Sequence, residues 1–124
     1  MLVAYDPSTK AQVTTSYQQA SSQGLTVARS MAYSNGGSKP LQYSPGNYNE
    51  QMFQALDFVI SEAANFGIHL IFTLGNNWND YGGKDQYVQW ARDQGQQTSS
   101  DDGFFTNPLV KQFYKNNIQV YRLF

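Results

Sequence analysis

Residues 67–83, GIHLIFTLGNNWNDYGG, place a short apolar run between a glycine and a polar, glycine-rich segment. Gly67 is a typical end for a helix, and the nearly unbroken apolar run from Ile68 to Leu74 predicts a strand that is covered on both faces. The asparagines and glycines that follow predict a loop from Asn76 to Gly83. A helix end, a buried strand and a loop in this order indicate one unit of an α/β fold.

The same pattern occurs once upstream. The stretch from Leu25 to Tyr33 predicts another buried strand, and the Ser-, Gly- and Pro-rich stretch from Ser34 to Gly46 predicts a loop. Between the two strands, Asn49 is placed to cap a helix, with Glu50 in its first turn. The apolar stripe of this helix consists of Met52, Phe53, Leu56, Val59, Ile60 and Ala63. Strands that alternate with helices predict a parallel sheet.

A helix is also expected before the first strand. Ser8 is predicted to cap it and Gly24 to end it. Between these two residues, Val13, Tyr17 and Ala20 recur at helical spacing. The chain therefore begins with a helix that presents one apolar face.

Two helices are expected after the second strand. A short one runs from Gln86 to Arg92, and a polar, exposed stretch follows from Gln94 to Gly103. The last helix starts at Asn107, with Pro108 in the first turn, where its missing N–H costs nothing. Its apolar face consists of Leu109, Val110, Phe113 and Tyr114. Since there is no internal repeat and no dividing linker, the sequence predicts one architecture or part of one.

The composition limits the classes of function. A chain of 124 residues with 40% hydrophobic residues is the size of one domain with a packed core. A net charge of −1 without a basic face gives no support for a nucleic-acid partner, and the longest apolar run is too short to span a membrane. Without cysteine and with one histidine, no disulfide, metal or cofactor site is expected. The start, MLVAYDPSTK, does not have the pattern of a secretory signal.

The residues at the ends of the two strands are the best candidates for function. In an α/β barrel, functional residues lie at the carboxyl ends of the strands and in the loops that follow. Arg29 could orient a carboxylate and keep it ionised. Asparagine amides can bond sugar hydroxyls, and an indole can cover the apolar side of a sugar ring. The predicted binding residues are Arg29, Met31, Asn76, Asn77 and Trp78, with Tyr81 beside them.

Each candidate also has a structural interpretation. Arg29 could pair with a local charge or extend to solvent, and Asn76 and Asn77 could simply form the turn. Trp78 and Tyr81 could pack the loop rather than bind a sugar. A structural role is expected for the helix-packing residues Trp90, Phe104 and Phe105, for His69 near the start of its strand, and for Asp101 and Asp102 as a solvated charge pair.

Four segments carry a resemblance to a known family. They are LTVARSMAYSNGG, LQYSPGNYNEQMFQALDFVISEA, GIHLIFTLGNNWNDYGGKDQYVQWARDQGQ and SDDGFFTNPLVKQFYKNN. Together they resemble consecutive segments of the plant endo-β-1,4-mannanases of glycoside hydrolase family 5, from Asp6 to about Asn117. The resemblance implies a (β/α)8 barrel that hydrolyses internal mannosidic bonds with retention of configuration.

The resemblance also implies which part of the barrel is present. The fold class is α/β, a fragment of a (β/α)8 TIM barrel from about helix 1 to helix 3, with two parallel strands and no closed barrel. Residues 1–124 would form one partial glycoside hydrolase domain without strand 1 and strands 4 to 8. The closing residues IQVYRLF differ from the family's third helix, and we expect an abnormal end from truncation or a shifted reading frame.

The family's arginine motif is partly retained. The family has a stretch similar to ARTW where this chain has residues 28–31, ARSM. By this resemblance, Arg29 corresponds to the arginine that supports the nucleophilic carboxylate. Met31 stands where the family has a substrate-contacting tryptophan, and a thioether offers no broad π-face to a sugar ring.

The catalytic carboxylates have no counterpart. Retaining hydrolysis needs two carboxyl groups about 5 Å apart, and in this family both are glutamates, one within an Asn-Glu-Pro motif. The only glutamates here are Glu50 and Glu62, both on the helix after Asn49, and Asn-Glu-Pro does not occur. Nothing in the sequence places two aspartates on opposite sides of a sugar. The aspartates considered for that role are Asp80, Asp85, Asp101 and Asp102.

The sequence therefore predicts a truncated relative of mannan endo-1,4-beta-mannosidase that does not hydrolyse its substrate. One alternative is a lectin-like remnant that binds mannan weakly, and another is a pseudogene product without a molecular function. A mannan-type polysaccharide is the only partner expected, with neither nucleic acid nor membrane. Members of the family are secreted to the cell wall, but the sequence leaves the location of this chain open.

Overall fold

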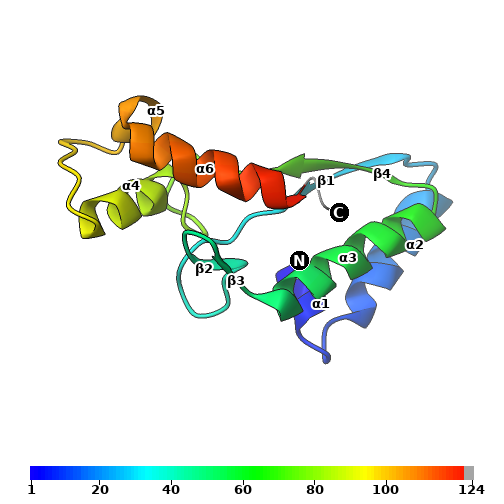
Figure 1. The fold of residues 1–124 in the computed structure, drawn as a ribbon. Helices are drawn as coiled ribbons and strands as arrows, with labels where there is room; N and C mark the ends of the chain where they lie inside the picture. The colour runs from blue at the N-terminus through cyan, green and yellow to red at the C-terminus, as the bar shows by residue number, and fades with distance from the viewer. Residues whose placement is uncertain (122–124) are drawn as a thin grey trace. The chain divides into compact units, whose positions relative to one another are not determined.

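The computed structural model describes residues 1–121, and the last residues of the segment IQVYRLF, 122–124, lie outside the described residues. Within residues 1–121, two helices are followed by three strands, one helix, one strand and three helices (Figure 1). The helices are α1 (Leu2–Tyr5), α2 (Ala11–Ser22), α3 (Glu50–Asn65), α4 (Lys84–Asp93), α5 (Gly103–Thr106) and α6 (Pro108–Tyr121). The strands are β1 (Val27–Met31), β2 (Gln42–Ser44), β3 (Asn47–Tyr48) and β4 (His69–Thr73).

These elements divide into two compact units. The first unit contains Met1–Ala32 and Asn49–Thr73, and the second contains Tyr33–Tyr48 and the residues from Leu74 onward. Each unit combines two segments that are not adjacent in the sequence. No change in composition marks the boundaries between the two units.

The first unit contains the predicted parallel strand pair. β1 pairs with β4 in parallel, with Val27 opposite His69 and Met31 opposite Thr73. One face of the pair packs on helices, since Leu70 contacts a buried cluster that includes Ala55 and Val59 of α3. Further residues of that cluster are Ala4, Tyr5, Val13, Tyr17 and Phe58.

The prediction that both strands are buried on both faces is wrong. Exposure alternates along β1 and β4: Val27 is 53% exposed and Ile71 is 59% exposed. Successive side chains of a strand point to opposite faces, so a single layer of helices covers only every second residue. A continuous apolar run gave no indication that one face would be open.

Of the two predicted ends of α2, only the carboxyl end is confirmed. Gln23 and Gly24 follow the helix, and Gly24 has a positive φ of 79°, a conformation that favours glycine. Ser8 does not cap α2, because the Asp6 carboxylate accepts its N–H and its hydroxyl at 2.9 and 2.7 Å. These bonds form a turn before the helix, and Lys10 occupies the cap position.

Helix α3 begins as predicted. Asn49 Oδ1 accepts the N–H of Met52 at 3.4 Å, which satisfies one of the free amides of the first turn. Within the predicted apolar stripe, Ile60 is 38% exposed, and Ala55 is buried instead. The stripe is thus rotated slightly from the face that hydrophobicity alone indicated.

The second unit is built around α4 and α6. Their buried side chains form one cluster: Tyr87, Val88, Trp90, Ala91, Val110 and Phe113. Asn107 Oδ1 accepts the N–H groups of Leu109 and Val110 at 2.9 and 3.2 Å, which confirms the predicted start of α6. Trp90 packs between helices as predicted, but Phe105 on the unpredicted helix α5 is 59% exposed.

The segment expected to be a loop from Ser34 to Gly46 contains part of a hairpin. β2 and β3 pair antiparallel, and Gly46 turns between them with a φ of 80°. Gln42 is fully buried, and its Oε1 accepts the hydroxyl of Tyr87 at 3.3 Å. The hairpin is therefore attached to the core of the second unit.

The buried hydroxyl of Tyr87 makes the stability of this unit sensitive to alkaline pH. Burial raises the pKa of Tyr87 far above the usual value, and the neighbouring Tyr121 and Tyr114 add to the rise. In the unfolded chain a tyrosine ionises near pH 10. Above that pH the unfolded state holds fewer protons than the native state, so stability falls as pH rises.

We expect the free energy of unfolding to fall above pH 10 by up to about 1.4 kcal/mol per pH unit for Tyr87. Urea unfolding followed by tryptophan fluorescence between pH 8 and 11 measures this slope. Tyr87→Phe should make it shallower, whereas Tyr43→Phe, at a side chain that is 47% exposed, should leave it unchanged. Equal slopes for Tyr87→Phe and the parent chain would show that this hydroxyl is not responsible.

Candidate functional site

Arg29 lies on the open face of the strand pair in the first unit. It stands opposite Ile71 in the register, and its Nε donates to Thr73 Oγ1 at 3.2 Å. Among residues 1–121, no carboxylate forms an ion pair with it. The guanidinium is therefore held by a neutral hydroxyl, and no carboxylate among residues 1–121 balances its charge.

Met31 lies on the same face as Arg29, two residues further along β1, and is 41% exposed. At the end of the strand, Ala32 N donates to Thr73 O at 3.0 Å, so the pairing of the strands extends one residue beyond Met31. Arg29, Met31 and Thr73 thus gather at the carboxyl end of the pair, as the strand-end argument predicted for the first two.

The other three predicted residues lie in the loop after β4, in the second unit. Asn76 Oδ1 accepts the N–H of Trp78 at 3.2 Å, and Asn76 O accepts the N–H of Lys84 at 2.8 Å. Asn76 therefore stabilises the turn, which agrees with the structural interpretation of this residue. Trp78 is 70% exposed, which excludes the interpretation that it packs the loop. Tyr81, 49% exposed, has a positive φ of 56°.

Asn76 and Asn77 also border a cavity of about 290 Å³ within the second unit. Its remaining lining is largely aromatic, from α4, α5 and α6. The lining residues are Leu74, Gly75, Asn76, Asn77, Gly83, Lys84, Tyr87, Phe104, Phe105 and Tyr114. Phe104, Phe105 and Tyr114 were predicted only as packing residues, because apolar side chains at helical spacing look the same whether they fill a core or line a cavity.

The structure therefore groups the five predicted binding residues in two sets. Arg29 and Met31 share one strand face in the first unit, and Asn76, Asn77 and Trp78 share one loop in the second. The first set offers a cation, and the second offers two amides and an exposed indole, which are groups that suit a carbohydrate. His69, expected to be structural, is exposed, and its backbone N–H donates to Thr26 O at 2.8 Å.

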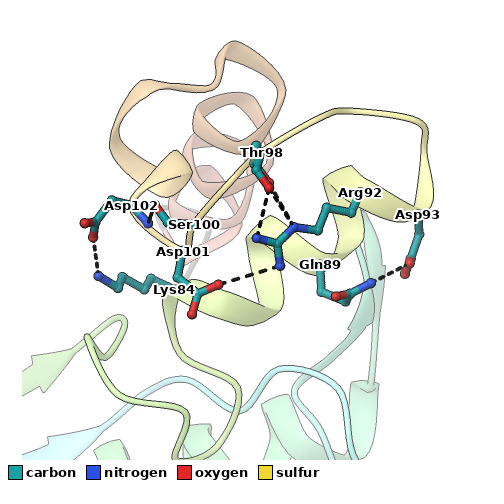
Figure 2. Close-up of polar contacts among 8 residues, drawn as sticks. All are labelled: Lys84, Gln89, Arg92, Asp93, Thr98, Ser100, Asp101 and Asp102. Atoms are coloured by element: carbon teal, nitrogen blue, oxygen red, sulfur yellow. Dashed lines mark hydrogen bonds and ion pairs between the residues drawn. The ribbon is translucent and has the colours of Figure 1, made fainter.

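Several carboxylates are engaged in structural contacts. Glu62 accepts hydrogen bonds from the Thr14 hydroxyl and from Asn65 Nδ2, and Glu50 lies in the first turn of α3. The side chains of Asp101 and Asp102 are 45% and 77% exposed, as expected of solvated charges, and each also pairs with a cation. Figure 2 shows their cationic partners, and the two ion pairs are Lys84–Asp102 at 2.7 Å and Arg92–Asp101 at 3.7 Å.

These pairs also fix the polar stretch that was expected to be simply exposed. Arg92 donates to the carbonyl and hydroxyl oxygens of Thr98, and Ser100 Oγ accepts the N–H of Asp102 (Figure 2). Within the part of the chain that the structure describes, no three His, Cys, Asp or Glu side chains are placed to hold a metal ion. No helix of residues 1–121 is both long and apolar enough to cross a membrane.

The chain is similar to known mannosidases over nearly its whole length. A family profile described as GH family 5 beta-mannosidase-like matches residues 2–121. Mannan endo-1,4-beta-mannosidase 4 of Solanum lycopersicum is 63% identical over 120 residues, which are 97% of this chain and 30% of the relative. Mannan endo-1,4-beta-mannosidase 7 of Arabidopsis thaliana is 55% identical over 96% of this chain and 28% of its own length.

Solved structures give the same result for the fold. The endo-1,4-beta-D-mannanase of Thermotoga petrophila superposes with a TM-score of 0.80 at 27% identity, over 94% of this chain and 34% of its own. The endo-1,4-beta-mannanase of Rhizomucor miehei gives 0.77 at 30% identity, over 88% of this chain and 32% of its own.

The chain spans about 30% of the length of its curated relatives. The predicted fold class, a fragment of a (β/α)8 barrel that does not close within residues 1–121, is confirmed. The profile match and the identities show that the chain belongs to the glycoside hydrolase family 5 mannosidases.

Proposed function

We propose that this chain carries part of the mannan-binding surface of an endo-1,4-beta-mannosidase, and that the 124 residues bind mannan without cleaving it. We further propose that residues 1–124 form one partial barrel domain, with β1 and β4 as the second and third strands of the barrel. The names of the similar proteins support mannan as the ligand.

The number and position of the glutamates carry the proposal that mannan is not cleaved. The sequence contains two, Glu50 and Glu62, and α3 holds both of them. Glu62 is occupied by Thr14 and Asn65. Retaining hydrolysis requires one carboxyl group that donates a proton and a second that attacks across the scissile bond. Two groups on the helical layer of an α/β fold do not meet that requirement.

The exposure of Trp78 supports binding rather than loss of all function. An indole that is 70% exposed, next to two asparagines, offers an apolar plane bordered by hydrogen-bonding groups. Separately, the first unit carries Arg29, a cation without a carboxylate partner among residues 1–121. This arrangement favours a carbohydrate ligand over a purely structural role for the loop.

Mannohexaose incubated with the purified 124-residue chain should be bound but remain intact. Titration calorimetry should give measurable heat at millimolar ligand, and Trp78→Ala should weaken binding about fivefold, since an aromatic contact contributes about 1 kcal/mol. Chromatography of the same samples should show no shorter oligosaccharides. Product that increases with the concentration of the chain would overturn the proposal that mannan is not cleaved, and absence of heat would overturn binding. Cellohexaose serves as the control ligand.

A further inference from the structure

The orientation of Trp78 depends on the backbone of its loop. Because 70% of the side chain is exposed, few packing contacts can hold the indole in place. The loop instead makes hydrogen bonds within itself. Asn76 Oδ1 accepts Trp78 N, Asn76 O accepts Lys84 N, and Gly82 N donates to Asn79 O at 3.0 Å.

A buried side chain from the other segment of the second unit ties this loop down. Asn35 is only 3% exposed, its backbone N–H donates to Tyr81 O at 2.9 Å, and its Nδ2 donates to Gly82 O at 3.0 Å. One residue thus satisfies two successive carbonyl groups of the loop. Buried amides that make such bonds fix the partner backbone, since breaking them leaves unsatisfied polar groups.

Gly82 allows this contact, and Gly83 allows the loop to approach its own backbone closely. Gly82 has a positive φ of 70°, and a Cβ on it would overlap the carbonyl oxygen of Asn35. A Cβ on Gly83 would overlap the carbonyl oxygen of Trp78. The backbones therefore approach more closely than any residue with a side chain would permit.

Asn35 itself is held by the core of the second unit. Its neighbour Ser34 accepts the N–H groups of Leu41 and Gln42 at its carbonyl oxygen, at 2.7 and 3.1 Å. Gln42 in turn accepts the hydroxyl of Tyr87. Hydrogen bonds thus connect Tyr87 of α4 to Gln42 and Gln42 to Ser34, and the peptide bond from Ser34 leads on to Asn35, which holds the loop of Trp78.

We propose that Asn35 is a positioning residue that holds Trp78 in the orientation that binds mannan. The role in binding rests on the proposed function, whereas the effect on the orientation of Trp78 does not. Asn35 acts through the carbonyl groups of Tyr81 and Gly82 and makes no contact with the ligand. It restricts the loop before the ligand arrives, so less conformational freedom is lost on binding.

The test uses the full chain with Trp90→Phe, so that Trp78 is the only tryptophan. Asn35→Ala should lower the residual anisotropy of Trp78 in time-resolved fluorescence, because the indole and its loop move more freely. The same variant should weaken mannohexaose binding about tenfold, measured through Trp78 emission. Asn79→Ala is the matched control, since Asn79 has an exposed side chain in the same loop, and both values should stay unchanged.

Two further measurements keep the result unambiguous. The melting temperature of each variant is recorded, and a lower melting temperature with unchanged anisotropy and affinity would overturn the proposal in favour of a merely structural role. If Asn35→Ala does not fold, Asn35→Leu replaces it, because this variant keeps the backbone bond to Tyr81 and a similar side-chain volume, and it removes the side-chain donor without adding a buried charge. If the parent chain binds no mannohexaose, the proposed function fails, and the anisotropy alone decides whether Asn35 orients Trp78.

Discussion

Leu70→Lys is expected to lower the free energy of unfolding of the first unit by about 2–4 kcal/mol, while the neighbouring Ile71→Lys changes it by less than about 0.5 kcal/mol. The two residues are adjacent on β4 but point to opposite faces. Leu70 packs against the cluster around Ala55 and Val59, so a lysine there would bring a charge into apolar surroundings. Ile71 is 59% exposed, and a lysine there stays in water.

Amide hydrogen exchange of the β4 and α3 backbones, followed at increasing urea concentration, measures this difference in the free energy of unfolding of the first unit. Tryptophan fluorescence would not, because Trp78 and Trp90 both belong to the second unit. The comparison tests which face of the strand pair the helices cover. Equal destabilisation by both lysines would mean that both faces are buried, as the apolar runs alone had predicted.

The ends of helices could be predicted because they depend on local bonds. Asn49 and Asn107 accept N–H groups of the next residues, and such a bond needs nothing outside one turn of helix. Ser8 failed as a cap because Asp6, two residues away, competes for the same turn. A hydroxyl and a carboxylate near a helix start give two similar signals, and the sequence does not rank them.

The hairpin could not be predicted, and the apolar runs did not show which face of the strands would be open. Burial depends on which elements surround a strand. In the run from Ile68 to Leu74, the residues that point to either face are mostly apolar, so the sequence does not distinguish a covered face from an open one. β2 and β3 are three and two residues long, too short to show an alternating pattern. They are stabilised by tertiary contacts such as that between Gln42 and Tyr87.

Only the part of the candidate site that depends on local position in the chain could be predicted. Arg29, Met31 and Trp78 were chosen for their position at strand ends, and the resemblance to the mannanases indicated mannan as the ligand that we propose. Asn35 was missed, because its importance lies in a bond to Gly82, 47 residues away in the chain. The sequence showed only a polar residue before two glycines, which is typical of any turn.

Phe113→Ala is expected to destabilise the second unit by about 3–4 kcal/mol. Phe113 is 8% exposed and belongs with Trp90 and Tyr87 to the cluster formed by α4 and α6. Removing the ring leaves a cavity that the aromatic neighbours fill only partly, which adds to the loss of buried apolar surface. Phe105→Ala is the control, because that ring is 59% exposed and should cost less than about 1 kcal/mol.

Urea unfolding followed by Trp90 fluorescence, in a chain with Trp78→Phe, measures both variants. Trp90 is 7% exposed and lies in the affected cluster, so its emission should shift to longer wavelength as the cluster opens. The midpoint should fall strongly for Phe113→Ala and little for Phe105→Ala. If both substitutions cost the same, Phe113 does not belong to a packed core. The contacts that support Tyr87, Gln42 and therefore Asn35 would then not be rigid enough to orient Trp78.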